Sequence, residues 1–412
     1  MATSGVPART ASRCAMTCAW LTAAASTSTI IGLPAVIPQL KEIFRLSHGE
    51  AGLIVTALWI PHAGSQLIAG WIAPAVGVRR LFRWTLCASV VALGVTLLAP
   101  SYASLLALRT VTGLLTGASF VLAILYAAAH TPPARQRESQ AMVGAMSYVG
   151  CVVAYAGIAV LLEAVGWRAG YLPSLGFYIA ALVLLEVGGW VDEKQLAAPG
   201  RASTSRVQWQ VRQVLSSFCS PRVALLAIAH LCSFGVIIVV ASWLTAYFVR
   251  LADMGSRASL LVSALVLVAG VLGRVASGRL FGRMSEISLI RGGLTCSGLA
   301  LFGLAAAPSL SIAPMLAFAV LGCCSLTYGP IVVLALGRSL SEEGARNVGS
   351  LTFLATLAAS TLPAVIGWLV DRHGSFGPGF VLLGILTASA VVLLPSAKLQ
   401  PAEAGGVSAD PA

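Results

Sequence analysis

The feature of this chain that most constrains its fold is a series of apolar runs, separated by short polar or Gly/Pro-containing loops. A helix needs about 20 apolar residues to cross the roughly 30 Å of hydrocarbon in a bilayer. Runs of about that length lie near residues 15–38, 50–73, 81–99, 103–126, 139–162, 170–191, 222–247, 257–278, 287–307, 311–336, 346–370 and 377–396. With 58% hydrophobic and only 10% charged residues, the composition also favours a membrane protein over a soluble one. The pattern predicts an all-α, polytopic membrane protein with twelve transmembrane helices.

The basic residues predict how these helices are oriented. If the amino terminus is cytoplasmic, 18 of the 26 Lys and Arg residues fall on the cytoplasmic side and 6 on the opposite side, with the other 2 inside the runs. This asymmetry is the positive-inside bias. It explains the net charge of +12 better than nucleic-acid binding does, because the basic residues are not grouped with aromatic ones. We therefore predict a multi-pass protein of the cell inner (plasma) membrane with both termini in the cytoplasm. The first run stays apolar through IIGLPAVIPQL, so we interpret it as a retained helix and not as a signal peptide.

This topology has a direct test. We expect reporter fusions at Ser203 and at the carboxyl terminus both to report the cytoplasm, because each point follows an even number of predicted spans. Alkaline phosphatase and a fluorescent protein, used as the two reporters, distinguish the sides of the membrane. An external signal from either fusion would contradict the predicted topology.

The twelve runs divide into two similar halves of six. Matching residues recur at an offset of about 208 residues: Gly70 with Gly278, Glu163 with Asp371, and Gly166 with Gly374. Carrier folds are often built from repeats of this kind. We predict a first six-helix half at 1–190, a cytoplasmic linker at 191–222, a second six-helix half at 223–398 and a disordered tail at 399–412.

A glycine-containing basic pattern follows the second run, in GWIAPAVGVRRLF. This segment resembles the loop G-x-x-x-D-R-x-G-R-[RK]-[RK] of the major facilitator superfamily of secondary transporters. The residues that match the pattern are Gly70, Gly77, Arg79 and Arg80. The similarity covers nearly the whole chain. The resemblance implies a twelve-helix carrier in which these residues, with Gly278 in the second half, serve gating and structure.

The chain departs from the family at two places. The acidic residue that in this family helps to hold the cytoplasmic gate closed is replaced by Pro74, and by Gly282 in the second half. The family's drug antiporters have a Gly-Pro pair in the fifth helix, where this chain has Ala154 and Tyr155. The missing pair makes drug efflux less favoured.

The fourth run contains a second resemblance to the same family. Arg109, Gly113 and Gly117 in LRTVTGLLTGAS match its R-x-x-x-G-x-x-x-G pattern. Small residues four apart let helix backbones approach closely in lipid, so packing is the favoured interpretation for the two glycines. For Arg109 we favour a functional role, in proton coupling, with packing as the alternative.

An arginine interrupts the eighth run, in LVAGVLGRVASGRLFGRMSE. A charged side chain inside a bilayer is costly and normally faces protein or a water-filled cavity. The repeat relates Arg274 to Gln66, and His62 lies one helical turn from Gln66. We predict that these three residues approach one another between the halves, where such carriers bind substrate. The alternatives are that Arg274 snorkels or binds carbonyls at the cytoplasmic gate, and that His62 satisfies a carbonyl freed by Pro61.

Two groups within the family are similar to this chain at Arg274. Nitrate-type and oxalate/formate-type carriers place an arginine at this point of the eighth helix. Nitrate-type carriers have a second arginine at the position of Gln66, which this chain lacks. The resemblance therefore implies an anion with one strong anchoring point, such as a monocarboxylate, and argues against nitrate.

Further candidates are aromatic or titratable residues in the runs. Tyr155, Trp243 and Tyr328 are predicted to line the substrate site, with core packing as the alternative. No acidic residue occupies the middle of the first, fourth or seventh run, where many proton-driven carriers have one. A histidine is then the better proton carrier, because its unperturbed pKa of about 6.5 lies near the working pH. We assign this role to His62, with His230 as a weaker candidate.

Together these patterns predict a secondary active transporter that moves a small organic solute by alternating access. An anion such as a monocarboxylate is favoured, with protons as the coupling ion in symport. The alternatives are an efflux carrier for hydrophobic or cationic drugs and, from another class, a non-transporting membrane receptor or scaffold. An enzyme is not predicted, because the sequence has no H-E-x-x-H, no G-x-S-x-G and no paired mid-membrane aspartates. We expect no cofactor, no metal and no nucleic-acid partner, and a monomer in the lipid bilayer.

Overall fold

The computed structural model describes residues 8–46, 48–187, 220–252, 256–280, 283–306, 312–337 and 342–394. The earlier elements are α1 (Ala8–Gly32), η1 (Pro34–Val36), α2 (Ile37–Phe44), α3 (His48–Val76), α4 (Val78–Thr96), α5 (Tyr102–Ala129), η2 (Pro133–Arg135), α6 (Gln136–Val165), η3 (Gly166–Gly170) and α7 (Leu172–Val187). The later elements are α9 (Pro221–His230), η5 (Leu231–Gly235), α10 (Val236–Ala252), α11 (Ser256–Leu280), α12 (Glu286–Ala305), α13 (Ala313–Leu326), α14 (Tyr328–Leu336), α15 (Glu342–Ala359), α16 (Leu362–His373) and α17 (Gly377–Leu393). The predicted tail at 399–412, and the predicted linker at 191–222 except for its last three residues, lie outside the described residues.

Each predicted apolar run falls on one helix or on consecutive helical elements, which confirms the all-α, twelve-helix prediction. Within the described residues, nine helical stretches are long and apolar enough to cross a membrane. The shorter apolar helices α7 and α17, together with α4, complete the twelve. The runs made of two helices are α9 with α10, α13 with α14, and α15 with α16. Pro363, in the first turn of α16, has no N–H to donate, so the helix is interrupted there.

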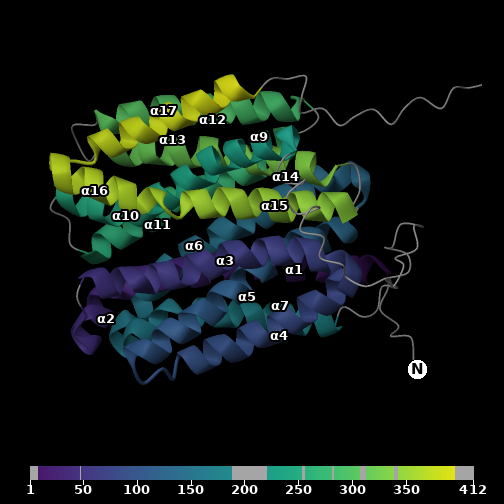
Figure 1. Cartoon of the computed structure of the whole chain (residues 1–412), viewed down its shortest axis with the longest axis horizontal. Coiled ribbons are helices and arrows are strands. Elements are labelled where there is room, and N and C mark those ends of the chain that lie inside the picture. The colour runs from purple at the N-terminus through teal and green to yellow at the C-terminus, as the bar shows by residue number, and fades with distance from the viewer. Residues whose placement is uncertain are drawn as a thin grey trace, which may run out of the picture.

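The helices pack in two groups, which Figure 1 shows with α1–α7 in the lower part and α9–α17 in the upper part. Two helix pairs make the main contacts between the groups, because α3 packs against α15 and α6 packs against α11. The sequence repeat relates α3 to α11 and α6 to α15. The two interfaces are therefore equivalent, as expected for halves related by a pseudo-twofold axis.

Small residues make close approaches at both interfaces. A Cβ on Gly70 would lie 2.8 Å from the Gly349 Cα and from the Ala345 carbonyl oxygen, and a Cβ on Gly278 would lie 3.2 Å from that of Ala141. The repeat relates Gly70 to Gly278 and also Gly349 to Ala141. Small residues thus let the halves meet closely at the end that we predict to be cytoplasmic.

We expect Gly70→Val to open this end of the molecule. The branched side chain would collide with the backbone of α15, and overpacking costs about 1–3 kcal/mol, so α3 and α15 should separate. A cysteine at Ser350, which is buried on α15, should then react about tenfold faster with a water-soluble maleimide, since tenfold corresponds to about 1.4 kcal/mol. Gly64→Val is the control, because a Cβ on Gly64 meets no heavy atom within 4 Å among the described residues. Equal labelling rates in the two variants would contradict a closed contact at Gly70.

Equivalent turns precede α7 and α17, which are the sixth and twelfth membrane-spanning helices. Gly166 follows α6 with a φ of 61°, and Gly374 follows α16 with a φ of 69°. Residues with a Cβ rarely adopt these positive φ values, whereas glycine does so at little cost. The two glycines, which occupy equivalent positions in the repeat, therefore terminate equivalent helices.

Burial follows the pattern of a protein in lipid. Large apolar side chains such as Val160 and Leu265 are exposed on the outer surface, where hydrocarbon can contact them. Inside, several Ser and Thr hydroxyls donate to the carbonyl four residues earlier, as Thr22 does to Cys18 at 2.8 Å. Buried polar side chains that lack such a local partner are therefore the candidates for function.

Candidate functional site

Arg274 lies on α11 at the interface between the two halves. The residue is 4% exposed, and its guanidinium carbon lies 3.8 Å from the ring centre of Tyr328 on α14 and 5.4 Å from that of Tyr148 on α6. Gly144, one turn before Tyr148, leaves room for the guanidinium, because a Cβ there would lie 2.8 Å from Nη1. The side chain does not reach the surface, so the snorkelling alternative does not describe it.

Several polar atoms around this guanidinium are unpaired. Nε and Nη1 of Arg274 are buried and form no hydrogen bond of acceptable geometry in the described part of the chain; the Tyr148 hydroxyl interacts with the guanidinium but not in hydrogen-bonding geometry. The same is true, within those residues, of the hydroxyls of Tyr148, Ser325 and Tyr328 and of Nδ1 of His230. An unsatisfied buried polar group costs about 1–3 kcal/mol, and more if it is charged. The arrangement therefore suits a ligand that accepts hydrogen bonds.

The charge of Arg274 has no carboxylate beside it among the described residues. The acidic residues whose side chains the structure describes lie at or near helix ends: Glu42, Glu50, Glu138, Glu163, Glu186, Glu286, Glu343 and Asp371. Buried charges are normally paired. An anion supplied from solution would complete this pairing.

His62 and Gln66 form a polar pair on α3. Nδ1 of His62 lies 3.0 Å from Oγ1 of Thr116, and its Nε2 lies 3.2 Å from Nε2 of Gln66. Thr116 donates in turn to the carbonyl of Gly113 at 3.0 Å. The imidazole thus interacts with side chains and not with a carbonyl freed by Pro61.

A chain of aromatic rings connects this pair to Arg274. No hydrogen bond within the described ranges joins Arg274 to His62 or Gln66. Ring contacts instead run from His62 to Trp59 at 5.6 Å, to Phe234 at 6.4 Å, to His230 at 5.3 Å and to Tyr328 at 5.9 Å, and Tyr328 contacts the guanidinium. The three residues that the sequence predicts as one cluster are therefore two polar groups, one in each half, linked by rings from both halves.

Arg109 on α5 is paired with protein groups. Its Nη1 donates to the carbonyl of Thr29 at 2.8 Å and to the hydroxyl of Tyr171 at 3.3 Å. Its Nη2 donates to the carbonyl of Ile30 at 3.1 Å, and its Nε to that of Ile54 at 3.3 Å. The guanidinium therefore joins α5 to α1 and α3, which supports a structural role. Its part in proton coupling stays a prediction.

The three predicted aromatic residues differ in their contacts. Tyr328 lies against Arg274, as described. The Tyr155 hydroxyl donates to the carbonyl of Ala241 at 3.1 Å, which links α6 to α10 across the halves, and Nε1 of Trp243 donates to the carbonyl of Pro363 at 3.1 Å. These two hydrogen bonds indicate packing roles for Tyr155 and Trp243.

Gly113 and Gly117 bring α5 against α3. A Cβ on Gly113 would collide with the carbonyl of Leu58, and one on Gly117 would collide with the carbonyl of His62. This close approach agrees with the packing interpretation of their spacing. It also holds Thr116 beside the His62 ring.

The turn between α3 and α4 contains other residues of the family pattern. Pro74, at the family's acidic position, lies inside α3. Gly77 makes the turn with a φ of 93°. Arg80 lies 4.7 Å from the ring centre of Trp84, one turn along α4, so its guanidinium packs along its own helix.

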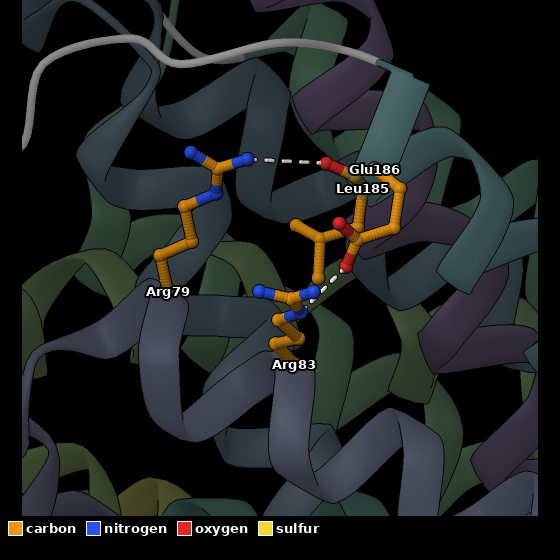
Figure 2. A network of polar contacts seen from close by, with 4 residues as sticks. All are labelled: Arg79, Arg83, Leu185 and Glu186. Atoms are coloured by element: carbon orange, nitrogen blue, oxygen red, sulfur yellow. Dashed lines mark hydrogen bonds and ion pairs between the residues drawn. The ribbon is translucent and has the colours of Figure 1, made fainter. Parts of the chain in front are cut away.

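Figure 2 shows how the other arginines of α4 contact α7. Arg79 donates to the carbonyl of Leu185 at 3.3 Å, and Nε of Arg83 forms an ion pair of 2.8 Å with Glu186. Both contacts lie within the first half. They hold α4 against α7 and do not bridge the two halves.

Other residues make charged contacts between the halves. Arg137, near the start of α6, forms an ion pair with Glu286, the first residue of α12. The guanidinium of Arg346 on α15 lies 5.9 Å from the ring centre of Trp71 on α3. With the glycine contact at Gly70, these interactions join the halves at the end where the family's acidic residue is missing.

Sequence reasoning did not select Tyr148 or Ser325, and it ranked His230 below His62. A tyrosine or serine in an apolar run usually packs or bonds to its own helix, so neither gives a signal of its own. His230 had a signal, since it is a titratable residue in an apolar run, but its closeness to Arg274 depends on the packing of α9, α11 and α14.

Comparisons with known proteins agree with this architecture. Residues 16–364 match the sequence profile described as Major Facilitator Superfamily. A probable sulfoacetate transporter of Cupriavidus necator is 24% identical over 384 residues, which cover 86% of each chain. A solved structure of the E. coli fucose:proton symporter has a TM-score of 0.71 at 14% identity, over 93% of this chain and 97% of that chain. A solved structure of the human organic anion transporter MFSD10 has a TM-score of 0.71 at 16% identity, over 96% of this chain and 100% of that chain. The solved structures show a shared fold.

Proposed function

Because the chain belongs to the Major Facilitator Superfamily, we propose that it is a secondary transporter of small organic anions in which Arg274 binds the anionic group. The observation that carries this proposal is the buried guanidinium whose Nε and Nη1 have no acceptor in the described part of the chain. A guanidinium offers two parallel donors to a carboxylate or sulfonate, and such charge-assisted hydrogen bonds are about twice as strong as neutral ones. Two of the similar proteins, the probable sulfoacetate transporter and the organic anion transporter, carry names that support this class.

The surroundings of Arg274 favour an anion with one anchoring group. The hydroxyls of Tyr148 and Tyr328 can donate to further oxygen atoms of a carboxylate or sulfonate. Their rings lie beside the guanidinium and can contact the organic part of the ligand. His62 and Gln66 provide a neutral polar group in the first half, which can bind the remainder of the ligand.

The transport cycle that we propose is alternating access with protons as the coupling ion. The protein would act as a monomer in the inner membrane, with cytoplasmic termini and the halves at 1–190 and 223–398 rocking about the site. The basic-residue asymmetry and the sequence repeat support this arrangement. The scarcity of carboxylates inside the spans favours a histidine as the proton carrier.

Thermal unfolding of the purified protein with defined ligands tests the anion proposal. We expect sulfoacetate or acetate to raise the unfolding temperature, because a ligand at 100 times its dissociation constant stabilises the native state by about 2.7 kcal/mol. Tetraphenylphosphonium, a hydrophobic cation, is the control and should not do so. Stabilisation by the cation alone would favour the drug-efflux alternative. Anion binding without uptake into proteoliposomes would favour the receptor alternative.

A further inference from the structure

His230 is a titratable side chain close to Arg274. It is the last residue of α9, is 3% exposed, and its Nδ1 has no hydrogen-bond partner within the described ranges. Its ring stacks on Phe234 at 5.3 Å and lies 5.9 Å from the ring of Tyr328, which also contacts the guanidinium of Arg274. His230 and Arg274 thus share Tyr328 as a neighbour, and an electrostatic interaction links them.

The helix is irregular directly after His230. Residues Leu231–Gly235 form a turn of π-helix, a feature frequently found at functional sites. Ser233 in this turn donates to the carbonyl of Cys324 at 2.9 Å and accepts a hydrogen bond from Thr327 at 2.7 Å. These bonds fasten the turn to α13, so the imidazole is held in place while its Nδ1 stays available.

His62 is less available for a proton. Both of its ring nitrogens already face polar partners, Thr116 and Gln66. If Gln66 donates to Nε2, the neutral imidazole has its one donor and its one acceptor satisfied. A protonated His62 would require the Gln66 amide to turn so that its oxygen, which has no partner among the described residues, accepts from Nε2, whereas His230 needs no such change.

Few charged groups surround His230 in the part of the chain that the structure describes. Helix α11 contributes Arg274 and α14 contributes Tyr328. The charged residues of α15 lie at its N-terminal end, within 342–346, and α17 has none. On its own helix, Arg222 lies in the first turn, at the opposite end. Arg274 is therefore the charge that matters most for a proton on this imidazole.

These placements support a coupling mechanism, which rests on the function proposed above. We propose that His230 takes up a proton when an anion binds at Arg274, so that one proton and one anion cross the membrane together. Two cations in one buried site repel each other, whereas an anion between them attracts both. By linkage, anion binding and protonation of His230 strengthen each other by the same factor. The proton passes from water to Nδ1 on one side and returns to water on the other, and only an N–H bond forms and breaks.

Proton uptake on binding tests this mechanism. Purified full-length protein is titrated calorimetrically at pH 7 with sulfoacetate, or with acetate if sulfoacetate does not bind, in two buffers of different ionisation enthalpy. We expect uptake of up to about one proton per anion by the wild type, because an imidazole carries one titrating proton. We expect none for His230→Asn, whose amide forms hydrogen bonds but does not titrate. His130→Asn is the control, since His130 lies at the end of α5, with Nδ1 2.8 Å from the carbonyl of Tyr126, and should take up protons as the wild type does.

A second measurement follows the proton during transport. In proteoliposomes that contain a pH-sensitive dye, an inward gradient of sulfoacetate, which unlike acetate has no neutral form that crosses lipid unaided, should acidify the lumen with the wild type and with His130→Asn. His230→Asn should slow this acidification at least tenfold.

The outcomes separate the two proposals. Anion binding without proton uptake by the wild type would overturn the coupling role and leave the anion site intact. Because this outcome needs only the wild type, it stays decisive even where His230→Asn does not fold. Loss of proton uptake in His62→Asn but not in His230→Asn would overturn the assignment to His230. Failure of both sulfoacetate and acetate to bind would overturn the proposed anion site, and the coupling mechanism with it.

Discussion

Arg274→Gln is expected to abolish the stabilisation by sulfoacetate and to raise the dissociation constant about 30-fold or more. Removing one partner of a buried charged pair costs about 2–5 kcal/mol, and each 1.4 kcal/mol is a factor of ten in affinity. Glutamine is polar and of similar length, but it has no charge and cannot present the two parallel donors of a guanidinium. The loss should therefore appear in binding of the anion.

The same substitution should leave the protein folded. Nε and Nη1 of Arg274 have no hydrogen-bond partner within the described residues, and no carboxylate there would be left unpaired. Replacing a buried charge that has aromatic neighbours but no carboxylate partner removes a desolvation cost. The unliganded variant should therefore unfold at the wild-type temperature or above it.

Calorimetric titration and thermal unfolding, each with sulfoacetate and with acetate, measure both effects. Arg274→Lys should keep part of the affinity, because it keeps the charge but loses the planar contact with Tyr328. Arg83→Gln is the control, since it removes an exposed ion pair with Glu186 and should bind as the wild type does. Full affinity in Arg274→Gln would assign the arginine to the gate and end the anion hypothesis.

Arg109→Met is expected to have the largest effect on folding. The guanidinium of Arg109 satisfies the carbonyls of Thr29, Ile30 and Ile54 and contacts the hydroxyl of Tyr171. Methionine fills much of the same space but removes the donor to the carbonyls of Thr29 and Ile30, which lie in the last turn of α1 and have no intrahelical donor. Each such group costs about 1–3 kcal/mol. We therefore expect the free energy of unfolding to fall by about 3–5 kcal/mol.

Thermal unfolding in detergent measures this loss, with size-exclusion profiles to score the folded fraction. Arg168→Met is the matched control, because Arg168 is exposed and donates to one carbonyl, that of Leu97 at 2.8 Å, so the change should stay within about 1 kcal/mol. Arg109→Lys should fold yet transport poorly, since one ammonium cannot reach all of these acceptors. Wild-type stability in Arg109→Met would show that the network on α5 does not hold α1 and α3.

The sequence alone was sufficient to predict the helices and the relation between the halves. Inside a bilayer every backbone N–H and C=O must be satisfied within the protein, so apolar runs such as 50–73 and 257–278 can form little else but spanning helices, and α3 and α11 lie there. The matches at Gly70 and Gly278 also related these helices to each other. His62 and Gln66 were predicted to be neighbours because an α-helix brings residues four apart onto one face.

Only the tertiary structure decided which polar side chains meet between helices. The sequence places Arg274 within the membrane, but its neighbours Tyr148, Tyr328 and His230 come from three other helices. Which of their faces meet depends on how each helix is rotated and packed against small residues such as Gly144. A hydropathy pattern is almost unchanged by such rotations, because nearly every face of these helices is apolar. The spans and the repeat therefore follow from local chemistry, whereas the neighbours of Arg274 follow from the packing of the two halves.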